Sequence, residues 1–176
     1  MSTDVLVMID VQKEYNTMGR AFYINGIEES LQNAKEVLNF ARTNKWNIIH
    51  IKHLQDGELF SRSSHYSDYI EGFSPRKSEK EFIKSNYSCF SSKDFSQELE
   101  KYKSSRVFIA GYNSTMCVLS TIIEGYHKGY EMNFVHDASG AKTDGKTPEQ
   151  ERHSIMTSVL SSFANILSVR DITNSI

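Results

Sequence analysis

The chain has 176 residues, 39% of them hydrophobic, with a formal net charge of −2 and both charge signs scattered along it. Length and composition predict one domain, residues 1–176, and exclude the basic surface of a nucleic-acid binder, a polybasic membrane anchor and a membrane span of roughly 20 apolar residues. The N-terminal segment lacks the basic region of a secretory signal, and Cys89 and Cys117 are the only cysteines, so we expect a cytoplasmic protein without a disulfide framework.

The first half of the chain alternates between apolar runs and helical periodicity. Residues 4–11, DVLVMIDV, form a nearly continuous apolar run that predicts a buried strand. Apolar residues at spacings of three and four predict a helix over residues 27–43. Residues 46–52 predict a second strand and residues 80–85 a short third one. The polar segment 53–79 lacks periodicity, and because such long loops are usually functional, we expect it to form one wall of a site.

The same alternation continues in the second half of the chain. Residues 91–103 predict a helix with a serine available as its N-cap, and the apolar run 105–111 predicts a strand that ends at glycine. A further helix is expected over residues 115–128 and a further strand over residues 130–138. These elements extend the strand–helix–strand pattern of the first half.

The last predicted helix, residues 147–164, carries a start signal. Thr147 is expected as its N-cap, Pro148 at the first helical position, and Gln150 as the residue that closes a capping box. Residues 165–169 predict the last strand. Strands alternating with helices predict an α/β fold, a three-layer α-β-α arrangement around a central, mainly parallel sheet.

Three chemically useful side chains follow the predicted strands. Ligands of such sheets bind beyond the carboxyl ends of the strands. The first strand ends at Asp10, the short third strand at Lys84, and the strand 105–111 leads through a turn to Cys117. We therefore expect a carboxylate, an amine and a thiol at one edge of the sheet.

These groups together suit nucleophilic catalysis. The nucleophile is the thiolate, and both a helix start and a neighbouring ammonium favour it, so we expect Lys84 to lower the pKa of Cys117. A carboxylate beside the thiol can accept its proton and later donate it to a leaving nitrogen. Each residue also has an ordinary structural role, as a loop acid, a solvated lysine or a small core residue, and spacing alone leaves those roles open.

The motifs around these residues resemble the isochorismatase-like cysteine hydrolase family. VMIDVQKEY supplies the family's Asp-x-Gln element with Asp10 and Gln12, and Tyr15 stands where an aromatic residue is usual. IKSNYSCF matches a lysine followed by a Ser-Ala-Phe-like element, through Lys84 and residues 88–90. GYNSTMCV and GYEMNFVHDASGA complete the series, so that the resemblance covers nearly the whole chain.

The resemblance implies an Asp–Lys–Cys triad on a Rossmann-like fold. Asp10 would transfer protons, Lys84 would activate the thiol through its positive charge, and Cys117 would be the nucleophile. It also implies a cis peptide bond between Tyr112 and Asn113, and an oxyanion hole made of the backbone N–H groups of Asn113 and Cys117. Asn113 departs from the small apolar residue that is frequent at its position, and its side chain is expected to reach the substrate.

A retained cysteine favours C–N hydrolysis through a thioester over the enol-ether hydrolysis of isochorismatases, which needs no nucleophile. The expected substrate is a small planar amide, in a pocket that includes Gln12, Tyr15, His53 and Tyr112. The alternatives that stay open include enol-ether hydrolysis, a non-catalytic family member and a thiol-based redox protein. Cys89 is expected to be inert. Because members of the family usually form dimers or larger assemblies, the resemblance implies a homodimer or larger homo-oligomer. No nucleic-acid or membrane partner is expected.

No cofactor and no metal are expected. Nicotinamidase-like members of the family carry an Asp-x-His…His cluster after the second strand, and this chain lacks it. His50, His53, Asp56 and His65 lie there at irregular spacing, whereas zinc needs three or four well-placed ligands. A metal-dependent nicotinamidase is therefore the less favoured alternative, and His53 is expected to line the pocket or bond locally.

Overall fold

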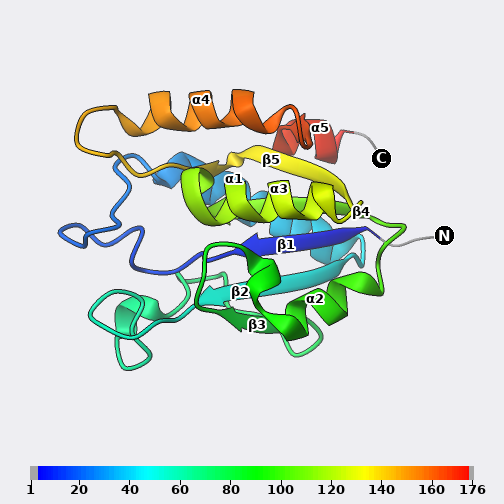
Figure 1. Cartoon of the computed structure of the whole chain (residues 1–176), viewed down its shortest axis with the longest axis horizontal. Helices are drawn as coiled ribbons and strands as arrows, with labels where there is room; N and C mark the ends of the chain where they lie inside the picture. Colours follow the sequence, from blue (N-terminus) through cyan, green and yellow to red (C-terminus); the bar gives the residue numbers. More distant parts are fainter. Residues whose placement is uncertain (1–3, 175–176) are drawn as a thin grey trace.

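A computed structural model describes residues 4–174 of the chain, and a six-stranded sheet runs through its centre (Figure 1). The strands are β1 (Val5–Ile9), β2 (Asn47–His53), β3 (Lys80–Lys84), β4 (Arg106–Tyr112), β5 (Glu131–Gly140) and β6 (Asn165–Leu167). Their order is β3-β2-β1-β4-β5-β6, and each neighbouring pair is parallel. The expected three-layer α/β fold with a parallel sheet is confirmed.

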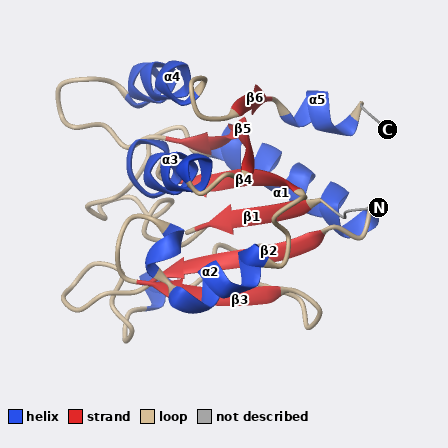
Figure 2. Cartoon of the chain, turned by 45° about the vertical axis from the view of Figure 1, so that its right-hand side comes forward, coloured by secondary structure: helices blue, strands red, loops and turns tan. Residues whose placement is uncertain are grey.

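Helices cover both faces of the sheet (Figure 2). They are α1 (Glu28–Thr43), α2 (Lys93–Glu100), α3 (Leu119–His127), α4 (Glu149–Leu160) and α5 (Val169–Thr173). Buried residues of α1 and α5 belong to one hydrophobic cluster, and buried residues of α2, α3 and α4 belong to the other. Within residues 4–174, none of these helices is long and apolar enough to cross a membrane.

Strand β1 shows how the two clusters arise. Its five residues are all buried, and successive side chains of a strand point to opposite faces. Leu6 and Met8 accordingly pack in the cluster that contains α1, whereas Val5, Val7 and Ile9 pack in the other. Burial on both faces explains why the segment is a continuous apolar run without polar alternation.

The order of the strands creates a switch point between β1 and β4. The chain proceeds from β1 outward to β2 and β3, then returns to the other side of β1 as β4. Ligands of open α/β sheets bind beyond the carboxyl ends of the strands at such a point. Figure 1 shows that the loops following β1 and β2 leave the sheet on the same side.

Gly111 allows β4 to lie close to β1 at this switch point. Its φ is +115°, and a β-carbon there would lie 2.1 Å from the carbonyl oxygen of Ile9. Any other residue would collide with the backbone of β1 and require a rare conformation. Ser139 Oγ donates a hydrogen bond of 2.5 Å to the Gly111 carbonyl and fixes it from the β5 side.

The start of α4 differs from the prediction. The helix begins at Glu149 with Pro148 as its N-cap, and no side chain caps it. The expected capping role of Thr147 is wrong because its N–H donates 2.8 Å to Asp144 Oδ1, so that Thr147 belongs to the preceding turn. The helix also ends at Leu160, earlier than expected.

Two other regions differ from their predicted boundaries. The expected helix over 115–128 consists of a π-helical turn, η3 (Ser114–Val118), followed by α3. The last strand is short, and the chain then forms α5, which was not predicted. A capping box between Ser168 and Asp171 starts α5. The spacing of these two residues in the sequence could have predicted the start of this helix.

The long segment after β2 packs beside the segment that follows β1. It contains one short 3₁₀ turn, η1 (His65–Ser67), and is otherwise irregular. The backbone N–H of Lys13 donates to the Asp68 carbonyl and that of Glu14 to the Tyr66 carbonyl, both at 2.9 Å. The two loops therefore form one continuous structure over the carboxyl end of β1.

Candidate active site

Asp10, Lys84 and Cys117 meet beyond the carboxyl ends of the strands. Asp10 directly follows β1, Lys84 is the last residue of β3, and Cys117 lies in η3 after β4. They are 0%, 3% and 4% exposed, respectively. The convergence that the strand ends predicted is therefore present, and the three groups are almost removed from solvent.

The ammonium of Lys84 joins the three groups. Its Nζ donates 2.8 Å to Asp10 Oδ2 and 3.2 Å to Cys117 Sγ, and lies 2.9 Å from Nδ1 of His53. An ammonium has three N–H donors, and these acceptors match that number. Because Lys84 donates to Nδ1, the proton of a neutral His53 lies on Nε2, which is 3.0 Å from Gln55 Oε1.

Burial and charge act together on the lysine and the histidine. Burial alone would lower the pKa of Lys84, but the charges of Asp10 and Cys117 outweigh it and raise this pKa above its ordinary value. Burial is the main cause that lowers the pKa of His53, and the positive charge of Lys84 lowers it further. Lys84 is therefore the cation of the site, and His53 is a neutral acceptor.

The net direction of the Cys117 pKa differs from the expectation. Burial and the Asp10 carboxylate raise the pKa of the thiol above its ordinary value, and Lys84 opposes them only in part. Lys84 acts in the expected direction, but burial and Asp10 outweigh it, and the sequence did not reveal how deeply the sulfur is buried. Burial thus favours the thiol form of Cys117, which lies beside the Asp10 carboxylate.

The Asp10 carboxylate has one engaged and one free oxygen. Its backbone adopts a left-handed conformation, with φ of +50°, and its N–H donates 3.0 Å to the carbonyl of Ile51. Oδ2 accepts from Lys84, whereas Oδ1 has no hydrogen-bond partner within residues 4–174. A buried carboxylate oxygen without a donor has a lone pair available for a proton.

The turn that carries Cys117 begins at a cis peptide bond between Tyr112 and Asn113, as the family resemblance implies. The N–H of Val118 donates 3.2 Å to the Asn113 carbonyl, which is the five-residue step of a π-helix. π-Helical turns occur frequently at functional sites. The Asn113 side-chain oxygen accepts from the N–H and hydroxyl of Thr115, at 3.1 and 2.9 Å. This oxygen is therefore held within the turn. The expected contact of the Asn113 side chain with substrate stays a prediction.

Gln12 connects two loops by its amide. Its Nε2 donates 3.0 Å to the His53 carbonyl and 2.8 Å to the Ser67 carbonyl, and its Oε1 accepts 2.8 Å from the His53 N–H. The side chain is fully buried. Gln12 was expected in the pocket, but its amide is bonded to backbone, so that it fixes the carboxyl end of β2.

Aromatic rings lie beside the three convergent groups. The ring centroid of Tyr15 is 5.6 Å from that of Tyr112, 5.5 Å from Phe60 and 6.0 Å from Phe22. Burial is the main cause that raises the pKa of Tyr15, and the nearby charges of Cys117 and Asp10 raise it further. Tyr15 and Tyr112 were predicted here. Phe60 was missed because it lies in the loop without periodicity.

The backbone of Phe60 is unusual. Its φ of +51° lies in the left-handed region, which is uncommon for a large side chain. The Phe60 N–H donates 3.2 Å to Oε1 of Glu14, a buried carboxylate that also accepts two hydrogen bonds from Arg20. The ring lies 5.1 Å from that of His53. The Glu14–Arg20 pair thus holds this ring beside the site.

One group of potential metal ligands occurs within the described chain, namely Asp10, His53 and Cys117, with ligand atoms within 4.8 Å of one another. The Lys84 ammonium is bonded to all three of these residues. A metal ion bound by the three ligands would have to take the place of this ammonium, so the arrangement fits a lysine better than a metal. His50 does not join the group, because its Nε2 lies 2.8 Å from Glu79.

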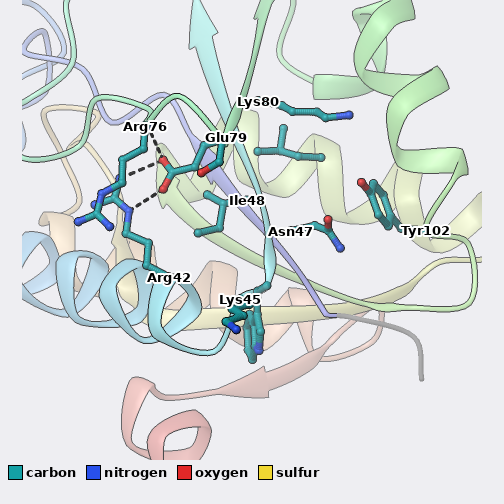
Figure 3. A pocket seen from close by; sticks show the side chains of 11 residues that line it. Arg42, Lys45, Asn47, Ile48, Arg76, Glu79, Lys80 and Tyr102 are labelled. Carbon is teal, nitrogen blue, oxygen red and sulfur yellow. Dashed lines mark hydrogen bonds and ion pairs between the residues drawn. The ribbon is translucent and has the colours of Figure 1, made fainter.

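A separate pocket of about 300 Å³ lies at the opposite, amino ends of β2 and β3 (Figure 3). Cationic side chains line it, but two of them are paired within the chain. Arg42 forms two hydrogen bonds with Glu79, and Lys80 Nζ lies 2.5 Å from Glu98. This pocket contains none of the residues that the motifs predicted and is not the candidate active site.

Cys89 lies beneath the site and is fully buried. Burial is the main cause that raises its pKa to about 12. Its N–H donates 2.9 Å to Thr121 Oγ1, whose hydroxyl donates 2.7 Å to the Cys117 carbonyl. Both cysteines are free thiols.

Comparisons with known proteins identify the family of the chain. Residues 4–171 match the isochorismatase domain. The chain is 26% identical over 171 residues to a secreted isochorismatase effector, Isc1, of Verticillium dahliae, covering 96% of this chain and 89% of that protein. It is 25% identical over 144 residues to an uncharacterized isochorismatase family protein of Bacillus subtilis, covering 80% and 79%.

A solved structure has the same architecture. The crystal structure of an isochorismatase from Pseudomonas putida matches with a TM-score of 0.85 and 25% identity, and the match covers 96% of this chain and 89% of that one. The domain match extends from before β1 to within α5 and includes Asp10, Lys84 and Cys117. The chain therefore belongs to the isochorismatase family of hydrolases.

Proposed function

We propose that this hydrolase cleaves a C–N bond of a small amide through a thioester on Cys117. One observation supports this most directly. Lys84 Nζ bonds to both Asp10 Oδ2 and Cys117 Sγ, while Asp10 Oδ1 has no partner within residues 4–174. A nucleophile, a cation and a carboxylate with a free oxygen are the groups that acyl transfer needs.

The first half of the reaction forms the thioester. As the Cys117 sulfur attacks the carbonyl carbon, its proton passes to Asp10, and the Lys84 ammonium stabilises the negative sulfur. The backbone N–H groups of Asn113 and Cys117 bind the oxyanion of the tetrahedral intermediate. Asp10 then returns the proton to the leaving nitrogen, the C–N bond breaks, and an amine or ammonia departs.

The second half releases the acid. Water attacks the thioester carbon while Asp10 accepts one of its protons. The C–S bond breaks as the second tetrahedral intermediate collapses, and the proton returns from Asp10 to sulfur. Asp10 thus serves as a base and an acid in each half, and neither half needs a metal.

The aromatic rings indicate the kind of substrate. Tyr15, Phe22, Phe60 and Tyr112 form one group of flat apolar rings, which reaches the site through Tyr15 and through Phe60 beside His53. Small-molecule sites are mostly apolar with a few converging polar groups. A small, uncharged, planar amide suits this site. Its flat face can pack against the rings while its carbonyl oxygen reaches the oxyanion hole.

Ammonia release from a panel of small primary amides, including nicotinamide, tests the proposal. The wild type is expected to release ammonia from at least one amide, and mass spectrometry is expected to find the acyl group on Cys117. Cys117→Ala should remove both signals. Cys89→Ala is the matched control and should retain them, because Cys89 takes no part in the reaction.

Two outcomes would contradict the proposal. Ammonia release that persists in Cys117→Ala would exclude the thioester. Hydrolysis of an enol ether but of no amide in the panel, again independent of Cys117, would favour the isochorismatase-type reaction instead.

A further inference from the structure

A histidine outside the three convergent groups holds the turn that carries Cys117. Ser114 is the first residue of η3, directly after Asn113, and is fully buried. Its Oγ lies 2.9 Å from Nδ1 of His153, which belongs to α4 and is 39 residues away in the chain. The outer helix α4 is thereby connected to the turn by one hydrogen bond.

The second ring nitrogen determines the direction of that bond. His153 Nε2 lies 2.9 Å from the carbonyl oxygen of His136 in β5. A carbonyl only accepts hydrogen bonds, so Nε2 carries a proton. Burial lowers the pKa of His153, which keeps the ring neutral and leaves a lone pair on Nδ1. The Ser114 hydroxyl is therefore the donor, and His153 connects β5 to the turn in a defined orientation.

Other contacts hold the remaining parts of this turn. Ser139 Oγ donates to the Gly111 carbonyl before the turn, and Thr121 Oγ1 donates to the Cys117 carbonyl after it. Within the turn, Asn113 Oδ1 accepts from Thr115. Ser114 lies between the two proposed oxyanion donors, and its hydroxyl bonds to His153.

The geometry points to His153 as a positioning residue that acts through Ser114 to set the Asn113 and Cys117 N–H groups toward the oxyanion. This inference rests on the proposed function. His153 contacts neither the thiol nor Asp10 in any described hydrogen bond, so its effect passes through the turn. Productive sites hold their groups within roughly 0.5 Å, and losing one oxyanion donor typically slows catalysis about 100- to 1000-fold.

Two reactions of the same sulfur separate this role from general support of the fold. p-Nitrophenyl acetate acylates a thiolate through a tetrahedral oxyanion: sulfur bonds to the acetyl carbon, the ester C–O bond breaks, and p-nitrophenolate leaves. Iodoacetamide alkylates the same thiolate by displacing iodide from carbon, and no oxyanion forms. A displaced oxyanion hole therefore slows the first reaction and leaves the second unchanged.

The test measures both rates at Cys117 in the wild type, His153→Phe and Ser114→Ala, with peptide mapping to separate Cys117 from Cys89. His153→Phe keeps a ring of similar shape without nitrogen. His127→Phe is the matched control, because His127 lies exposed at the end of α3. Thermal unfolding of each variant identifies any protein that is not folded.

We expect acylation to fall about 10- to 100-fold in His153→Phe and Ser114→Ala, with alkylation within about twofold of wild type. The double variant should be no slower than either single one, because both remove the same hydrogen bond. His153→Asn should recover part of the rate, since its amide oxygen can accept from Ser114 where Nδ1 does. His127→Phe should match the wild type.

Each other result has a definite meaning. Equal losses of acylation and alkylation, or additive effects in the double variant, would overturn the inference by making His153 a structural residue. Acylation at the wild-type rate in folded His153→Phe would overturn it while leaving the proposed function intact. A wild type that is not acylated at Cys117 would remove the proposed function, and the inference with it.

Discussion

Lys84 Nζ and Asp10 Oδ2 form an ion pair at 2.8 Å in which both side chains are fully buried. The two charges act on Cys117 in opposite directions: after burial, Asp10 raises the pKa of the thiol, and Lys84 lowers it. In the proposed mechanism, Asp10 accepts the thiol proton and Lys84 is the counter-ion of the thiolate. Replacing Lys84 or Asp10 removes one of these two effects on the pKa of Cys117 and leaves the other.

Replacing Lys84 should make Cys117 less reactive. Lys84→Met removes the cation that stabilises the thiolate, so the pKa of Cys117 should rise further, and each unit of rise reduces the thiolate population about tenfold. The pH dependence of iodoacetamide alkylation, with Cys117 resolved by peptide mapping, measures this shift. Lys80→Met is the control, because Lys80 lies on the same strand but pairs with Glu98. An unchanged titration in folded Lys84→Met would contradict the proposed role of Lys84.

Replacing Asp10 should have the opposite effect on the thiol. Asp10→Asn keeps the shape but removes the negative charge that raises the pKa of Cys117, so alkylation at neutral pH should be as fast as in the wild type or faster. Hydrolysis should nevertheless be lost, because the proton acceptor is gone. The same alkylation titration, together with ammonia release from an amide that the wild type cleaves, tests this pair of effects. Slower alkylation with retained hydrolysis would be incompatible with a proton-transfer role.

Activity should survive removal of metal ions. The Lys84 ammonium already bonds to the three residues that could coordinate an ion. Acylation of Cys117 by p-nitrophenyl acetate should therefore keep its rate after prolonged dialysis against a chelator, with metal content followed by elemental analysis. Loss of the reaction, with recovery on adding zinc or iron, would instead support a metal-dependent, nicotinamidase-like enzyme.

Glu79 should make stability sensitive to acid. Burial alone would raise its pKa, but hydrogen bonds from Arg42, the Arg76 N–H and His50 lower it from 4.5 to about 2. A lowered carboxyl pKa contributes stability above the unfolded value of 4.5, and this stability is lost as pH falls through about 2. Glu79→Gln should lower the free energy of unfolding at pH 7 by about 3 kcal/mol, because it leaves Arg42 buried without its partner.

Urea unfolding between pH 7 and pH 2 tests this expectation. The difference between wild type and Glu79→Gln should shrink toward the acid end, where the wild type also loses the charge. Glu36→Gln, at an exposed position on α1, is the control and should change stability by less than about 0.5 kcal/mol. A constant difference at every pH would mean that the ionised carboxylate is not what stabilises this region.

The parallel sheet between two layers of helices and the meeting of Asp10, Lys84 and Cys117 were predictable from the sequence. Buried parallel strands are continuous apolar runs, helices between them show their own period, and such units bring the carboxyl ends of strands to one edge. A residue just after a strand is then placed by the backbone alone. Asp10 and Lys84 were found by this reasoning, and the family motifs added the cis peptide bond before Asn113.

Only the tertiary structure decided which other side chains reach that edge and how they change its chemistry. Phe60 and His53 meet because an irregular loop folds over β1, and irregular backbone has no period to read. His153 reaches Ser114 across 39 residues, through the packing of α4 against η3, which depends on helix orientation. The raised pKa of Cys117 reflects how completely the surrounding chain excludes water, and desolvation is a property of the packed molecule that no short stretch of residues determines.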